Sequence, residues 1–426
     1  MAESTFTPKE NYKLTVLRQT LVGKITNGQA GKLLGLSIRQ VRRLKRLVEK
    51  DGNEAIIHRL KGKPSNHQAP KSLKGRVLSQ VKEVYRDFKP AFAAEKLSEN
   101  DHLIVHPQTL RRWMIAEGLW KQRKRKKVDY RSWRPRKEYF GQLEQFDGSY
   151  HDWFEGRYRN SNGEPIETCL LAAIDDATGK ITHAWFSPHE GVVPVFLFWH
   201  VYVYTLGKPL GIYLDKFSTY KINHKSALDN SELMTQFERL AQNLDIELIT
   251  AHSPQAKGRI ERLFQTLQDR LVKEMRLESI NTPQTGNRFL KKIFIPKFNE
   301  QFAVTAAKEG NVHRPLIKLD RQNSNRIFSI QSKRTINNDF TIQFENVWYQ
   351  LLELQPTTIR PKETILTEKW LNGTVHFSFR GYYLNYSVLP QRPKKQKANP
   401  AIITRHKLMW KPGPNHPWRK PFRNHS

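Results

Sequence analysis

The spacing of apolar residues changes along the chain and divides it into three parts. From about residue 10 to residue 120 apolar positions recur every three or four residues, the period of amphipathic helices. Between about 140 and 300, short apolar runs typical of strands alternate with stretches of helical spacing. Between 325 and 390 apolar and polar positions alternate between turn residues, as in antiparallel strands. The pattern predicts a multidomain protein that is all-α, then α/β, then all-β.

The clearest pair of helices is predicted between Ile25 and Gly52. Ser37 and Gln40 have the spacing of a capping box, which begins a helix, and a short helix over Gln29–Leu34 precedes it after a tight turn. This arrangement predicts a helix-turn-helix unit over residues 1–65, whose second helix can enter the major groove of DNA. The alternative is a plain helical hairpin with a solvated basic face. The DNA contacts expected on the second helix are Arg39, Gln40, Arg42 and Arg43.

A second helical unit, resembling the first less clearly, is predicted over residues 72–120. The stretch VLSQVKEVYRDF has the apolar spacing of a helix, and two further helices follow it. Pro107 favours the start of the last helix, because the first turn of a helix needs no amide hydrogen there. The DNA contacts expected on this helix are Gln108, Thr109, Arg111 and Arg112.

The middle part, residues 140–300, is predicted to form a mixed sheet with helices. The stretch Pro194–Leu206 is apolar throughout and should be buried, as a helix or a strand, and a long helix should begin near Gly258. Three strands, one helix, two strands and a final helix is the element order of a ribonuclease H-like fold. The expected strand regions are Leu143–Arg157, which contains Asp147, the hairpin Cys169–Ser187, Pro209–Tyr220, which contains Asp215, and the stretch IELITA that follows.

The remaining segments complete the predicted organisation. A small β-barrel is expected over residues 325–390. A basic linker, 121–139, precedes the middle part, and a basic, proline-rich tail, 391–426, ends the chain. Residues 121–137 hold ten Lys/Arg against one acid, and the tail holds ten Lys/Arg and no acid. We expect both segments to bind phosphates, and the tail to be extended when free.

The net charge of the chain indicates what it binds. The 426 residues include 72 Lys+Arg and 40 Asp+Glu, a formal net charge of +32, so a polyanion such as double-stranded DNA is the expected partner. Cys169 is the only cysteine, which excludes an internal disulfide and a cysteine-rich zinc module. The most apolar stretch, Val192–Leu206, is shorter than the ~18–20 residues that span a bilayer. We therefore expect no membrane association and a cytoplasmic protein.

Glu261 is the residue that suggests chemistry. It stands between Arg259 and Arg262 in a basic helix, one position from the core residue Ile260, and so at the rim of the apolar face. A surface ion pair would explain it, but so would a metal site. Phosphodiester chemistry uses two Mg²⁺ ions about 3.5–4 Å apart, held by carboxylate oxygens. The side chains expected to contact the DNA backbone beside Glu261 are Lys257, Arg259 and Arg262.

Several motifs together carry a resemblance to a known family. SPQAKGRIERLFQTLQDRLVKEMRL, QFDGSYHDWFEGR, AIDDATGK and YLDKFSTYKIN resemble the ISNCY-type insertion-sequence transposases, within the superfamily of DDE transposases and retroviral integrases. LGLSIRQVRRL, FAAEKLSE, TLRRWM and HPWR extend the resemblance over nearly the whole chain. The glutamate motif is specific, whereas the helix-turn-helix motifs alone are weak.

The resemblance implies a site and a reaction. It implies Asp147, Asp215 and Glu261 as the catalytic and metal-binding triad, with Mg²⁺ as cofactor and Mn²⁺ able to replace it. It also implies binding of the element's terminal inverted repeats, capture of target DNA, and DNA cutting and joining by a homo-oligomer assembled on DNA. Such a protein would be prokaryotic and associated with the nucleoid. The alternative function is a catalytically inactive DNA-binding regulator of the element.

Other carboxylates could replace members of this triad as metal ligands. Asp229, in LDNSEL, is closer in spacing to Glu261 than Asp215 is, but Asp215 ends an apolar strand and Asp229 does not. We prefer Asp215, which makes the stretch 221–232 an insertion. Asp175 and Asp176 stand where a hairpin needs turn-forming residues, and we expect them to serve that turn.

Overall fold

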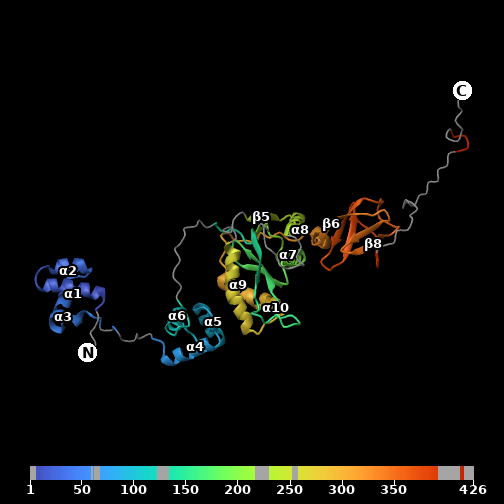
Figure 1. Ribbon diagram of the computed structural model, residues 1–426. Coiled ribbons are helices and arrows are strands. Elements are labelled where there is room, and N and C mark those ends of the chain that lie inside the picture. The colour runs from blue at the N-terminus through green and yellow to red at the C-terminus, as the bar shows by residue number, and fades with distance from the viewer. Residues whose placement is uncertain are drawn as a thin grey trace, which may run out of the picture. The chain divides into compact units, whose positions relative to one another are not determined.

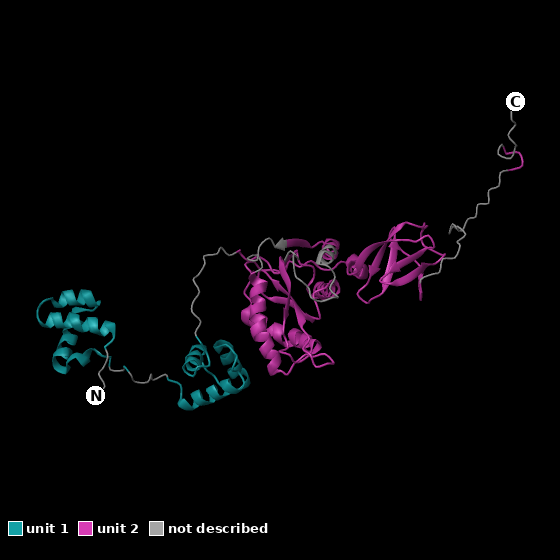
Figure 2. Ribbon diagram, in the orientation of Figure 1, with its two compact units in different colours: residues 1–124 teal, residues 125–426 magenta. Residues whose placement is uncertain are grey.

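The computed structural model describes residues 6–58, 61, 68–121, 134–215, 230–251, 258–391 and 413–416. The chain has two compact units, residues 1–124 and residues 125–426 (Figure 2). Within the described residues no helix is long and apolar enough to cross a membrane. Most of the basic linker, and the basic tail except residues 391 and 413–416, lie outside the described residues, so the expectations for them stay predictions.

The first unit is helical, as predicted. Thr26 with Gln29, and Ser37 with Gln40, form capping boxes at the starts of α2 and α3, and Gly35 ends α2 in the left-handed conformation at φ 64°. Val41 and Val48 of α3 are buried against α1 and α2. The two helices and the tight turn predicted from the sequence are therefore present, with an additional helix, α1, before them. The elements are α1 Pro8–Leu21, α2 Asn27–Leu34, α3 Ile38–Asp51 and the 3₁₀ turn η1 Asn53–Ile56.

Three further helices complete this unit. Pro107 begins the last of them, with His106 as the N-cap, as the sequence predicted. Leu110 and Met114 are fully buried, and the adjoining aromatic residues Phe88 and Phe92 stack on each other. The helices are α4 Lys71–Glu83, α5 Pro90–Asn100 and α6 Pro107–Ala116.

The second unit is built on a mixed sheet flanked by helices (Figure 1). The sheet has five strands in the order β3-β2-β1-β4-β5. The first three strands are antiparallel neighbours, whereas β4 is parallel to β1 and β5 is parallel to β4. This is the ribonuclease H-like arrangement that the element order predicted. The strands are β1 Glu144–His151, β2 Thr168–Asp175, β3 Ile181–Ser187, β4 Gly211–Asp215 and β5 Glu247–Ala251.

Helices cover both faces of the sheet. Phe146 of β1 packs with α7 and α8 on one face, while Ala172 of β2 packs with α9 and the helices after it on the other. Because side chains alternate along a strand, odd-numbered residues of β1 belong to the α9 face. The helices are α7 Val192–Leu206, α8 Asn230–Asn243, α9 Gly258–Leu277, α10 Pro283–Phe289, the π segment η3 Leu290–Phe294 and α11 Ile295–Phe302.

Helix α8 corrects the predicted order of elements. The sequence suggested two strands in succession after Pro209, yet β4 and β5 are parallel and are joined through α8. Parallel neighbours need a crossover connection, which is usually a helix. Phe237, Leu240 and Leu244, at helical spacing, are buried in the core beneath it and would have predicted it. Part of the stretch taken for an insertion therefore belongs to a helix of the fold.

The C-terminal part consists of two antiparallel sheets, in the orders β11-β10-β9-β6 and β12-β8-β7. They enclose a core of their own that includes Ile342, Ile365 and Phe377, so the expected C-terminal β structure is confirmed. The side chains of Gln236 and Arg239 on α8 bond to backbone atoms of Gln331 and Ser329 and connect this part to helix α8. The elements are α12 Lys318–Gln322, α13 Ser324–Ile327, β6 Ile330–Thr335, β7 Thr341–Phe344, β8 Val347–Leu351, β9 Thr364–Lys369, β10 Val375–Phe379, β11 Tyr382–Tyr383 and β12 Tyr386–Leu389.

Candidate active site

Asp147 and Glu261 line one pocket with a volume of about 300 Å³. Asp147 is half-buried in the course of β1, and Glu261 is exposed in the first turn of α9. The contacts between β1 and α9 bring together two residues that lie far apart in the sequence. Gln268, two helical turns further along α9, donates to Ser149 Oγ at 3.4 Å, so the strand and the helix run side by side along the pocket.

The backbone of Asp215 lies at the end of β4, next to β1. The parallel ladder pairs Gln145 of β1 with Tyr213 of β4. Counting two residues onward in each strand puts Asp147 and Asp215 at the same level of the sheet, where adjacent strands are about 4.8 Å apart. The side chain of Asp215 lies outside what the structure describes, as does the whole of Asp229. The register position is therefore the structural observation that bears on the choice between them.

The pocket holds a third described carboxylate that the sequence did not single out. Glu190 lies in the connection between β3 and α7, and its backbone amide donates to Tyr150 Oη at 3.0 Å. Gly148 makes room for it, because a methyl group on Gly148 would lie 2.7 Å from Glu190 Cδ. No local pattern marks Glu190, since only the return of β3 beside β2 brings it to β1. Among the described residues, no group of three or more His, Cys, Asp and Glu side chains is close enough to hold a metal ion.

The surroundings of the pocket affect two nearby titratable groups. Burial, together with the charges of Glu190 and Asp147, raises the pKa of Cys169 well above its usual value. Burial also raises the pKa of Tyr150 to about 12. Both groups therefore stay protonated at neutral pH, which leaves the carboxylates as the anionic ligands that the pocket offers.

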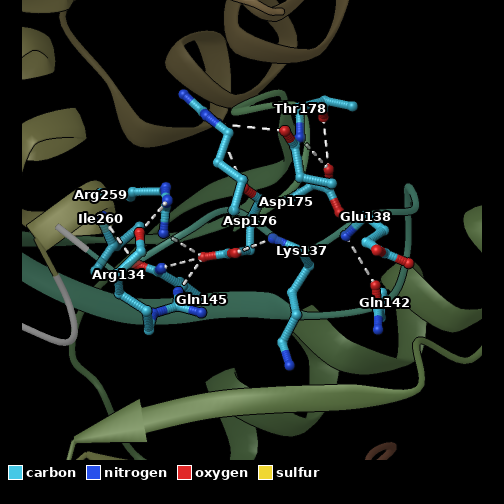
Figure 3. A network of polar contacts seen from close by, with 12 residues as sticks. Arg134, Lys137, Glu138, Gln142, Gln145, Asp175, Asp176, Thr178, Arg259 and Ile260 are labelled. Atoms are coloured by element: carbon cyan, nitrogen blue, oxygen red, sulfur yellow. Dashed lines mark hydrogen bonds and ion pairs between the residues drawn. The ribbon is translucent and has the colours of Figure 1, made fainter. Parts of the chain in front are cut away.

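Asp175 and Asp176 stand in the turn after β2, as predicted, and they also bond to residues outside this turn (Figure 3). Asp175 accepts from the amide and the hydroxyl of Thr178, at 2.7 and 2.6 Å, and from the amide of Gly141 at 3.0 Å. Burial raises the pKa of Asp175. Asp176 has no exposed surface and binds two arginines, Arg134 and Arg259. The network lies beneath the pocket, at the start of β1 and α9.

Arg259, one of the expected DNA contacts, bonds to other residues of the protein. Its Nη1 donates to Asp176 Oδ1 at 2.7 Å, and its Nη2 donates to the backbone carbonyl of Arg134 at 3.2 Å. Burial lowers its pKa, and the charge of Asp176 partly offsets that effect. The fold brings the turn after β2 against the start of α9, so the guanidinium bonds to Asp176, while its side chain keeps 22% of its surface exposed and the DNA contact stays a prediction. Arg262 is exposed, and Lys257 lies outside the described residues.

The four residues expected to contact DNA on α3 are all exposed. Gln40 has a competing role, because its Oε1 accepts from the amide and the hydroxyl of Ser37, at 3.1 and 3.3 Å. A glutamine that contacts adenine uses the same oxygen, so base contact by Gln40 would require this cap to open. Arg39, Arg42 and Arg43 carry no such constraint among the described contacts.

The residues expected to contact DNA on α6 differ in exposure. Gln108 and Arg112 are exposed, whereas Thr109 and Arg111 are half-buried. The backbone amide of Gln108 donates to His106 Nδ1 at 3.2 Å, which caps the helix. The two exposed side chains are therefore the more accessible candidates on this helix.

The fold and the site together define a class of protein. A five-stranded sheet of this order, with Asp147 on its central strand and Glu261 on the helix beside it, is the core of the integrase-like polynucleotidyl transferases. No family model matches the chain. Two curated relatives do, and they identify the class more closely.

The relatives are both transposases. "Putative transposase y4bF" of Sinorhizobium fredii is 37% identical over 398 residues, which cover 93% of this chain and 84% of the relative. The transposase for insertion sequence IS1202 of Streptococcus pneumoniae is 29% identical over 382 residues, which cover 80% of this chain and 77% of the relative. The chain belongs to the transposase family that these two proteins represent.

Solved structures that the chain resembles include retroviral integrases. The HTLV-2 integrase catalytic core domain in complex with magnesium is 18% identical, covers 36% of this chain and 88% of its own, and has a TM-score of 0.26. The simian T-cell lymphotropic virus intasome in complex with PP2A regulatory subunit B56 gamma is 12% identical, covers 67% of this chain and 93% of its own, and has a TM-score of 0.30. These TM-scores are too low to support a structural assignment. The fold is therefore assigned from its own strand order and connections.

Proposed function

We propose that the protein binds the terminal inverted repeats of its own insertion sequence and catalyses Mg²⁺-dependent DNA cleavage and strand transfer. The observation that carries this proposal is the shared pocket of Asp147 and Glu261, with the backbone of Asp215 level with Asp147 on the neighbouring strand. The sequence motifs that resemble those of ISNCY-type transposases, and the DDE triad that this resemblance implies, agree with the arrangement.

The side chains at the pocket fit a hard divalent cation. Asp147 and Glu261 offer carboxylate oxygens, the ligands that Mg²⁺ prefers, and Asp215 is the proposed third ligand. Bound metal ions would supply activation of the attacking oxygen and stabilisation of the leaving oxygen at the phosphate. Mn²⁺ has the same ligand preference and would replace Mg²⁺.

The chain itself supplies binding and orientation. The exposed Arg262, next to Glu261, would contact the phosphate backbone, and the basic linker and tail would add contacts that do not depend on base sequence. The helix-turn-helix of α2 and α3, and helix α6, would select the terminal repeats. A homo-oligomer on DNA would hold both element ends and the target DNA, in the cytoplasm and at the nucleoid.

Three single substitutions test the catalytic part of this proposal. Asp147→Ala, Asp215→Ala and Glu261→Ala should each abolish nicking of element-end DNA in Mg²⁺, because each would remove a metal ligand. Binding to the same DNA in a gel shift should persist. Glu278→Ala, which removes an exposed carboxylate just beyond the other end of α9, is the matched control and should cut normally.

Two outcomes would change the proposal. If Asp215→Ala cuts DNA normally and Asp229→Ala does not, Asp229 is the second aspartate. If the unaltered protein binds the element ends but cuts none of them in Mg²⁺ or Mn²⁺, the protein is a regulator that keeps the fold of a transposase.

A further inference from the structure

We propose that Asp176 is a positioning residue, which holds the first turn of α9, and with it Glu261, against β1. The inference rests on the proposed function of Glu261 as a metal ligand. Asp176 lies outside the pocket and follows the end of β2, so it acts through the residues that it binds.

The carboxylate of Asp176 collects donors from three separate segments (Figure 3). Arg259 Nη1 and Gln145 Nε2 each donate to Oδ1 at 2.7 Å, and Arg134 bonds to the same oxygen. The backbone amide of Lys137 donates to Oδ2 at 2.9 Å. Because Asp176 and Gln145 have no exposed surface, the bond between their side chains has no competition from bulk water.

Gln145 connects this network directly to the helix. Its Oε1 accepts from the backbone amide of Ile260 at 3.2 Å, while its Nε2 is held by Asp176. The amides of the first turn of a helix have no partner within the helix, so a side chain from β1 satisfies one of them here. The donation to Asp176 determines which way the Gln145 amide is turned, and therefore presents its oxygen to Ile260.

The two ends of this bridge are next to the proposed ligands. Gln145 precedes Asp147 by two residues and so lies on the same face of β1. Ile260 and Arg259 come directly before Glu261 on α9. The bonds from Asp176 to Gln145 and Arg259 thus set the distance between the strand that carries one carboxylate and the helix turn that carries the other.

Segment 134–137 closes the network from the side of the basic linker. Arg134 bonds to Asp176 and contacts the ring of Tyr213 on β4 at 5.8 Å, and Arg136 donates to the backbone carbonyl of Asp176 at 3.3 Å. Residues 134–137 therefore bond to the same aspartate that bonds to the start of α9.

Hydrogen exchange on the full-length, metal-free protein tests the inference without relying on activity. In Asp176→Asn the amide replaces a carboxylate that accepts bonds from Arg134, Arg259, Gln145 and Lys137, so the hold on the start of α9 weakens. We expect amides in residues 258–263 to exchange about tenfold faster, with residues 267–271 unchanged. The half-activating Mg²⁺ concentration for nicking should rise about 10- to 100-fold, as for other residues that orient metal ligands.

Glu368→Gln is the matched control. Glu368 is also fully buried and accepts from Ser378 and Tyr383 beside an arginine, but it lies in the C-terminal sheets. It should lower thermal stability without changing exchange in residues 258–263 or the Mg²⁺ requirement. If Asp176→Asn fails to fold, Arg134→Gln replaces it, since this substitution removes one partly exposed donor and should shift both readouts in the same direction.

The outcomes separate this inference from the proposed function. A folded Asp176→Asn or Arg134→Gln protein with unchanged exchange in residues 258–263 and an unchanged Mg²⁺ requirement overturns the inference, even if Glu261→Ala is inactive. Conversely, a Glu261→Ala protein that still cuts DNA overturns the proposed function, while the exchange data still decide whether Asp176 holds the helix turn.

Discussion

Gly148→Ala tests whether Glu190 occupies the pocket beside Asp147. The added methyl group would lie 2.7 Å from Glu190 Cδ and 3.1 Å from Cys169 Sγ. The end of the Glu190 side chain can swing away at small cost, but the sulfur of Cys169 is buried and must shift with the core. Overpacking of this kind costs about 1–3 kcal/mol, and we expect the lower half of that range.

The expected decrease in stability is large enough to measure. For a unit of about 150–250 residues, 1 kcal/mol corresponds to about 2–4 °C in Tm. Thermal unfolding of the full-length protein should therefore show the transition of the core lowered by about 2–8 °C. Nicking should also decline, because the displaced carboxylate of Glu190 moves within the pocket that Asp147 lines.

A double-mutant cycle identifies the neighbour responsible. In the Glu190→Ala background the clash with the carboxylate is absent and only the contact with Cys169 remains. Gly148→Ala should then cost less, with a coupling of about 0.5 kcal/mol or more, as for residues in contact. An equal decrease of Tm in both backgrounds would show that Glu190 does not lie over Gly148, and that the packing described for this side of the pocket is wrong.

Three further predictions concern recognition, charge and pH. Arg39→Ala and Arg43→Ala should each reduce the preference for element ends over random DNA by ~1–3 kcal/mol if the arginine makes a bidentate base contact, and equal weakening on both DNAs in a gel shift would instead indicate binding to phosphates. Deleting residues 392–426 should weaken binding to all duplexes alike and lower the slope of log K against log[salt] by ~0.9 for each phosphate that the tail neutralises; a lower mass by light scattering with an unchanged slope would mean that the tail assembles subunits. Burial and the nearby Lys291 lower the pKa of His183 to about 4, so the unfolded chain binds the extra proton first as pH falls, and stability should decrease between pH 6.5 and pH 4. The free energy of unfolding of His183→Gln, measured by denaturant titration, should decrease less over that interval than that of the unaltered protein. The same pH dependence in both proteins would show that His183 is not the group responsible.

Local patterns were sufficient wherever neighbouring residues decide the structure. The capping box of Ser37 and Gln40, the proline that begins α6 and the apolar period of α9 all act within one or two helical turns, and each appears in the structure as predicted. The charge balance, likewise a property of composition, pointed to nucleic acid before any fold was known. The apolar spacing of α8 could also have predicted this helix. What requires a connection of this kind is that β4 and β5 are parallel, because parallel neighbours need a crossover.

Only the tertiary structure decided which side chains distant in the sequence contact each other. Glu190 lies in a loop and Asp176 in a turn, where carboxylates are common. Nothing in the sequence around them shows that one lines a pocket and the other is buried in an ion pair. Arg259 and Arg262 stand three residues apart in one basic run, yet one is engaged by a buried aspartate and the other is exposed. The sequence determined that α9 carries basic residues beside its apolar face. The tertiary structure determined which of them forms an ion pair within the protein, because it brings the turn after β2 against the start of α9. Arg259 and Asp176 are more than 80 positions apart in the chain, so no local pattern could predict their contact.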